Sequence, residues 1–71
     1  MNIGNKITLK GISKHGKDRI HQFGNCWIIK CFADKVGFDD KKGNWIGLID
    51  ANGKNDFRWV HETNDKNFMI V

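Results

Sequence analysis

The sequence has no tyrosine, only two cysteines and no long apolar run. The absence of tyrosine excludes the tyrosine-lined groove with which small domains recognise proline-rich peptides. The longest apolar runs have about four residues, whereas a transmembrane helix needs about 20. No basic segment followed by an apolar one opens the chain, so we expect no signal peptide and no membrane contact. The expected location is cytoplasmic.

The two cysteines, Cys26 and Cys31, are five positions apart in a segment with the pattern of a strand. Alternate strand residues face opposite sides and each advances the chain by roughly 3.3 Å, so these thiols cannot form a disulfide with each other. Unpaired thiols are typical of a reducing compartment. A site built from both cysteines and His21 would have no recognised ligand spacing, and we therefore expect no metal and no cofactor.

The length of 71 residues predicts a single domain over residues 1–71 with a small core, because so short a chain buries only about 60% of its unfolded surface. A disulfide or a metal usually reinforces a domain of this size. Without either, self-association remains open, and the expected state is a monomer or a weak homodimer.

The positive charge of the chain is concentrated in one segment. Twelve Lys and Arg residues against eight Asp and Glu residues give a net charge of +4. Between Lys10 and His21 there are four basic residues and one acid, a net of +3, while the remainder carries eight and seven. Such a local excess favours a partner that carries phosphate or an acidic protein surface.

The clearest structural pattern runs from Trp45 to Glu62, where two apolar-rich segments flank Asn52-Gly53. This dipeptide favours a tight hairpin turn, and a two- or four-residue turn sets even positions of the first strand opposite odd positions of the second. The side chains predicted to face the core are Ile46, Leu48, Phe57 and Trp59. Those predicted to face outward are Trp45, Gly47, Arg58 and Val60. A three-residue loop, which would group Ile46 and Leu48 with Arg58, is the less favoured alternative.

Three more strands are predicted around this hairpin, over Ile3–Lys10, Cys26–Ala33 and Phe68–Val71. Alternation along the second of them groups Trp27 with Ile29 and Cys31, although both of its faces are largely apolar.

A helix is one of three options for the segment between the first two strands. Ser13 could cap its start and Gly24 could end it, with Ile20 and Phe23 on one side. Because Gly16 lowers helix propensity, a full helix over residues 14–23, a single turn after Gly16 and an irregular loop all remain open. If helical, the segment would expose a basic side formed by Lys14, Lys17 and His21.

These elements predict a mostly β fold, a five-stranded antiparallel SH3-like small barrel with a short helix as an option between strands one and two. The five-stranded OB-fold is the nearest alternative. It usually places a helix between strands three and four, where Asn52-Gly53 leaves no room.

A resemblance to known proteins rests on two parts of the chain. They are Gly11 to Trp27, with Ser13-Lys14-His15-Gly16-Lys17, Arg19-Ile20 and Gly24, and then Arg58-Trp59-Val60 with Asn64-Asp65 and Phe68. These segments resemble small uncharacterised proteins of bacteriophages, including phages of cyanobacteria, and the likeness covers most of the chain in outline. It implies a phage-encoded accessory protein that acts inside a host bacterium. It implies no catalytic residue.

The histidines are the only candidates for catalysis. His15, His21 and His61, with Asp18 or Glu62, could supply acid–base groups of the kind that cleave RNA. Their spacing matches no recognised motif, so surface histidines are the preferred interpretation and we expect no enzyme activity.

Two binding functions are in contention. In the first, the basic segment contacts the phosphates of a nucleic acid while Trp45 and Arg58 offer a stacking surface; Trp45 could instead pack under Val36 or Phe38. In the second, the same segment binds an acidic surface of a host protein such as a polymerase or another enzyme. The predicted binding residues are Lys10, Lys14, His15, Lys17, Arg19, His21, Trp45 and Arg58.

Overall fold

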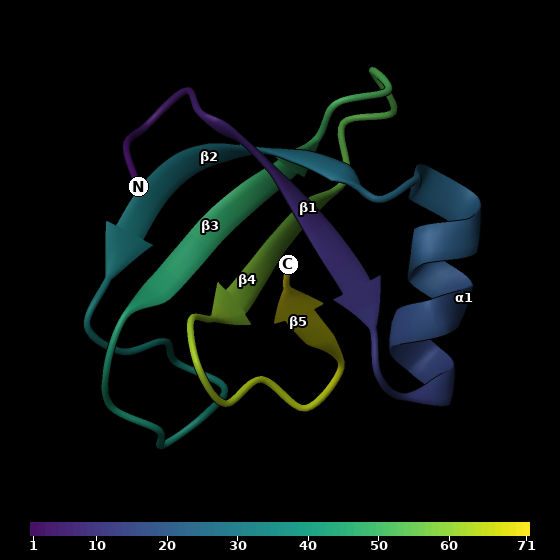
Figure 1. The fold of residues 1–71 in the computed structure, drawn as a ribbon. Coiled ribbons are helices and arrows are strands. Elements are labelled where there is room, and N and C mark those ends of the chain that lie inside the picture. The colour runs from purple at the N-terminus through teal and green to yellow at the C-terminus, as the bar shows by residue number, and fades with distance from the viewer.

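The computed structural model describes residues 1–71 and consists of one antiparallel sheet and one helix (Figure 1). The elements are β1 (Lys6–Gly11), α1 (Lys14–Phe23), β2 (Cys26–Ala33), β3 (Trp45–Asp50), β4 (Phe57–His61) and β5 (Phe68–Ile70). The strand order is β4-β3-β2-β1-β5. The predicted mostly β fold with five antiparallel strands is confirmed. The sheet is not closed, because β4 and β5 are its edge strands and do not pair with each other.

Helix α1 begins and ends where the sequence predicts. The Ser13 hydroxyl accepts a hydrogen bond from the Gly16 N–H at 3.0 Å, and the Gly24 N–H donates to the Ile20 carbonyl at 2.8 Å. The full helix is therefore the correct alternative. Gly16 lowers helix propensity but is required for packing, because a methyl group there would collide with the backbone carbonyl of Asn67. In length and apolarity α1 falls short of a membrane-crossing helix.

The core lies on one face of the curved sheet. Its buried members are Leu9, Trp27, Ile29, Ile46, Leu48, Val60 and Phe68. From α1, Ile20 and Phe23 pack against this cluster. Trp27, whose face the sequence does not decide, is fully buried, and its indole N–H donates to the Gly24 carbonyl at 3.0 Å.

A β-bulge in β2 moves Cys31 to the other face of the sheet. The register shifts between Ile29 and Cys31, so Ile29 lies opposite Leu48 whereas Cys31 lies opposite Gly47. The prediction that Cys31 shares a face with Ile29 is therefore wrong. Both cysteines are unpaired, as predicted.

The register of the β3–β4 hairpin differs from the predicted one. Ile46 pairs with Val60 and Leu48 with Arg58, so all four lie on the core side of the hairpin. Phe57 and Trp59 alternate with these residues along β4 and therefore lie on the opposite face. The prediction that Phe57 and Trp59 share the core face with Leu48 is wrong, and so is the prediction that Val60 faces outward.

Asp50 explains this register, because its carboxylate holds a loop wider than a tight turn. It accepts hydrogen bonds from the backbone N–H groups of Lys54 at 2.9 Å and Asp56 at 2.7 Å. Burial acts to raise the pKa of Asp50, but the backbone hydrogen bonds together outweigh it and hold the pKa below its ordinary 3.8.

The wide loop also reaches the carbonyl end of α1. The side chains of Asn52 and Lys54 donate hydrogen bonds to the carbonyls of Phe23 and Gln22, at 2.8 and 2.7 Å. These carbonyls have no partner within the helix. A turn confined to Asn52-Gly53 would place Lys54 in the strand and lose these contacts.

Candidate functional site

The face of the β3–β4 hairpin opposite the core carries a row of aromatic side chains. The rings of Phe57 and Trp59 meet edge to face with centroids 5.4 Å apart. Gly47 makes room for this pair, because a methyl group there would lie 2.8 Å from Cζ of Phe57. Phe57 remains 43% exposed, and Phe38, which lies in the segment between β2 and β3, remains 72% exposed. Two aromatic rings are therefore available to a ligand.

Trp45 lies on the same face of the hairpin but is buried. Its side chain is 1% exposed, and its indole N–H donates to the Lys41 carbonyl at 3.0 Å. The ring packs edge to face against both Phe38 and His61, with centroids 5.8 and 5.0 Å away. The alternative in which Trp45 packs under Phe38 is correct. Trp45 lies on the face opposite the core cluster, as predicted. The prediction that it offers a stacking surface is wrong, because the segment between β2 and β3 folds back over it.

A groove of about 240 Å³ lies beside these rings and is called the aromatic groove below. One set of walls is aromatic and comes from Phe38, Phe57 and Trp59. The groove also borders His15 in the first turns of α1, Arg58 on β4 and Lys66 in the segment before β5. Segments far apart in the sequence thus combine aromatic and basic side chains in one concave surface.

The acidic side chains of the aromatic groove are already engaged within the protein. Asp39 accepts a hydrogen bond from the Lys41 N–H at 2.8 Å, and its other oxygen lies 3.9 Å from the Lys41 ammonium. Asp65 accepts three backbone hydrogen bonds. Lys66, by contrast, takes part in neither of the two ion pairs of the chain. The groove lining therefore carries two cations, Arg58 and Lys66, and two acids, and of the cations Lys66 is the one without an ion-pair partner.

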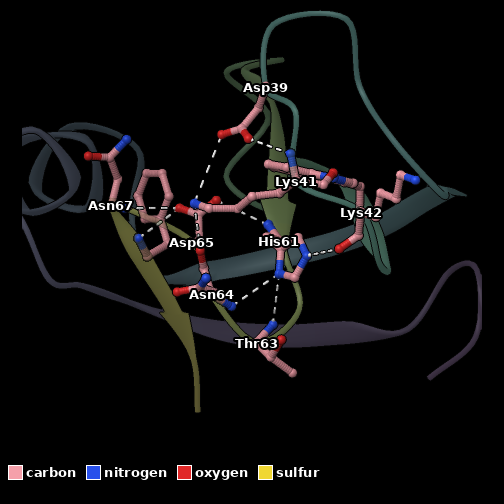
Figure 2. Close-up of polar contacts among 10 residues, drawn as sticks. Asp39, Lys41, Lys42, His61, Thr63, Asn64, Asp65 and Asn67 are labelled. Carbon is pink, nitrogen blue, oxygen red and sulfur yellow. Dashed lines mark hydrogen bonds and ion pairs between the residues drawn. The ribbon is translucent and has the colours of Figure 1, made fainter.

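The Asp65 carboxylate links the two edge strands at the base of the groove. Figure 2 shows it accepting hydrogen bonds from the backbone N–H groups of His61, Asn67 and Phe68, each at 3.0 Å. His61 ends β4 and Phe68 begins β5. One side chain therefore bridges two strands that share no hydrogen-bonded ladder.

The buried ring of His61 fixes the segments on either side of it (Figure 2). Its Nδ1 accepts hydrogen bonds from the backbone N–H groups of Asn64 and Thr63, at 3.1 and 3.3 Å. Because Nδ1 accepts, Nε2 carries the hydrogen and donates to the Lys42 carbonyl at 3.1 Å. Both nitrogens are engaged, so the geometry gives His61 a structural role.

Three of the predicted binding residues form the exposed side of α1. Lys14, Lys17 and His21 point into solvent, as their helical spacing predicts, and Asp18 lies among them. Neither lysine belongs to an ion pair. Figure 1 shows α1 standing beside β1, so this basic side covers one flank of the molecule.

The other predicted residues are distributed between the groove and its surroundings. His15 and Arg58 border the aromatic groove, and Trp45 forms part of its floor. Arg19 is half-buried, with its guanidinium 5.8 Å from the centroid of the Phe23 ring. Lys10 is exposed on β1, opposite Met69 of β5. The eight residues therefore do not form one site.

Sequence reasoning did not assign four lining residues of the groove to a binding site, namely Phe38, Phe57, Trp59 and Lys66. Phe38 could have been found, since it is an isolated aromatic residue within a polar, turn-forming segment. Phe57 and Trp59 were assigned to the core through the hairpin register, and nothing in the sequence brings Lys66 near them.

No protein-family model, curated protein or solved structure matches the chain. No group of three or more His, Cys, Asp and Glu side chains is placed to hold a metal ion. The aromatic groove and the basic side of α1 are the features on which a function can rest.

Proposed function

We propose that this chain is a small nucleic-acid-binding domain that contacts phosphates through the basic side of α1. The observation that carries the proposal is that Lys14 and Lys17, one helical turn apart, are exposed and free of ion pairs. A lysine that neutralises a phosphate displaces the counterions held there, and this release favours binding. A lysine already held in an ion pair within the protein would gain less binding free energy from the same phosphate contact.

The proposed fold class is the SH3-like small barrel, in an open form. Two features of the sheet support it. The strand order β4-β3-β2-β1-β5 returns the last strand to the side of the first. In addition, β2 pairs with β1 over its first residues and with β3 along its length, as a strand that bends between two halves of a barrel would do.

The proposed setting is the cytoplasm of a host bacterium, with the protein acting as a phage-encoded accessory factor. The resemblance of Ser13-Lys14-His15-Gly16-Lys17 and Arg58-Trp59-Val60 to small phage proteins supports this setting. Binding would serve the phage without any catalytic step, which agrees with the structural role of His61.

The free edge of β4 favours a second candidate function, the binding of a host protein. The Asp50 N–H donates to the Asp56 carbonyl, and the Glu62 N–H donates to the Asn44 carbonyl. In an antiparallel pair every second residue bonds across the ladder, so Phe57 and Trp59 turn their backbone groups away from β3. An extended segment of another protein could pair with these groups by strand addition.

The salt dependence of affinity for a single-stranded oligonucleotide tests the nucleic-acid function. Each phosphate contact contributes about 0.7 to the slope of log affinity against log salt. Replacing Lys14 and Lys17 together by alanine should lower that slope by about 1.4 and weaken binding to all sequences alike. Lys30→Ala, at an exposed lysine on β2, is the matched control and should leave the slope unchanged. Undetectable binding at low salt would contradict the proposal.

A further inference from the structure

We propose that the aromatic groove is a second contact site on the same ligand, where unpaired bases stack on Phe38 and Phe57. This inference rests on the proposed function and narrows it, because it makes the preferred ligand a single strand rather than a duplex. The lysines of α1 contact only phosphate and so do not distinguish a single strand from a duplex. The groove supplies that selectivity.

The two exposed rings are held in place before any ligand binds. Phe38 rests edge to face on buried Trp45, and Phe57 rests edge to face on Trp59. Such supported rings lose little conformational freedom when a base stacks on them. Stacking also tolerates any base, since every base has an aromatic face.

Two cations beside the rings, Arg58 and Lys66, can contact the phosphates of a strand. Lys66 carries no ion pair, and Arg58 engages Asp56 only through Nε, at 2.9 Å. Of the two acids of the groove, Asp39 is paired with the Lys41 ammonium, and Asp65 keeps its charge while its oxygens accept three backbone hydrogen bonds. A strand can therefore place its bases on the rings while its backbone meets the two cations.

The groove also lies in reach of the phosphate contacts proposed for α1. His15 borders the groove, and its neighbour Lys14 stands on the exposed side of the helix. A strand that leaves the groove past His15 therefore meets Lys14 and then Lys17. A duplex cannot follow this path with its bases in the groove, because its bases are stacked inside and only their edges are accessible.

The test compares binding of an oligothymidine strand and of a duplex of equal charge to the whole chain. Phe38→Ala and Phe57→Ala should each weaken binding of the strand about 5- to 150-fold, the range reported by alanine substitution of stacking residues. Duplex affinity and the salt slope should not change, since no ionic contact is removed. Phe32→Ala is the matched control, because Phe32 is 45% exposed on β2 and does not line the groove.

The possible outcomes separate this inference from the function on which it rests. Selective loss of strand binding in both groove variants, with thermal unfolding showing that both remain folded at the assay temperature, supports the groove. Equal affinity for strand and duplex, unaffected by Phe38→Ala, would overturn the groove inference and leave the phosphate contacts of α1 standing. Absence of binding to either ligand at low salt would overturn both. Binding of a polyglutamate peptide that needs Phe57 and displaces the strand would assign the groove to a protein partner instead.

Discussion

The two faces of the β3–β4 hairpin differ in both chemistry and exposure. On the core face, Ile46, Leu48 and Val60 are each at most 1% exposed. On the opposite face the aromatic pair of Phe57 and Trp59 stays at the surface, with Phe57 43% exposed. The outer face is nevertheless exposed only in part, because Trp45, which shares it, packs under Phe38 and is 1% exposed. Cover by another segment, rather than hydrophobic size, therefore decides which rings of this hairpin are buried.

The largest expected effect tests the core face. Leu48→Ala leaves a cavity in the centre of the cluster and should lower the free energy of unfolding by about 2–5 kcal/mol. Phe57→Ala should cost less, because it removes mainly an edge-to-face pair worth about 0.5–1.5 kcal/mol. Urea denaturation of both variants checks the ranking. A greater loss from Phe57→Ala would mean that the faces are assigned the wrong way round.

The second prediction concerns the end of β4, which Asp65 anchors by accepting a hydrogen bond from the His61 N–H. Asp65→Ala leaves backbone N–H groups of His61 and Phe68 without their acceptor and should cost about 1–3 kcal/mol. Asp40→Ala is the control, because Asp40 is exposed and takes part in no ion pair; it should stay within about 0.5 kcal/mol. Thermal or urea unfolding measures both. Equal effects would show that the link between β4 and β5 adds nothing to stability.

The third prediction uses pH to loosen the loop that sets the register of the two faces. The pKa of Asp50 is lower in the folded state than its ordinary 3.8. Its contribution to stability is therefore fully present above about pH 4 and is lost as pH falls through the folded-state pKa. Asp50→Asn should be less stable at neutral pH and should lose less stability on acidification. Urea unfolding at several pH values checks this, and an unchanged acid sensitivity in the variant would contradict it.

The smallest expected effect lies at the edge of the aromatic face. Phe38 is 72% exposed, so Phe38→Ala should change the free energy of unfolding by no more than about 0.5 kcal/mol. It should nevertheless uncover Trp45, whose fluorescence should become easier to quench with acrylamide. A stability loss above about 1 kcal/mol would make Phe38 part of the core rather than part of a binding surface.

Local patterns in the sequence were sufficient to predict most of the secondary structure. The strand Cys26–Ala33 and the helix from Lys14 to Phe23, with Ser13 and Gly24 at its ends, lie where predicted. Each depends on residues close together in the chain, such as a capping hydroxyl or a β-branched run. The position of β5 does not follow in this way, because β5 pairs with β1 although a short connection joins it to β4.

The hairpin register could not be predicted, because it depends on contacts between distant residues. Asn52-Gly53 favours a tight turn locally, but Asp50 binds the backbone of the loop and Lys54 reaches the carbonyl of Gln22 in α1. From Trp45 to Ile49 both faces of β3 carry no polar side chain, so alternation could not reveal an error of one residue. The same applies to Gly16, whose role becomes visible only beside Asn67.

The candidate site was predicted only in part, because it too depends on residues that are distant in the sequence. Periodicity within one helix correctly predicted that Lys14 and Lys17 are exposed. The aromatic groove combines residues of α1, β4 and two connecting segments, and its shape exists only in the folded chain. Trp45 was misassigned because its cover, Phe38, comes from a segment with no regular structure of its own.

The shortness of β5 has a consequence for where the sheet opens first. This strand has three residues and a single neighbour, β1, whereas β2 has eight residues and two neighbours. Local opening costs least where few ladder bonds must break, so the amide hydrogens of β5 should exchange with solvent well before those of β2. The edge of β1 that pairs with β5 is therefore the part of the sheet most often uncovered by local opening.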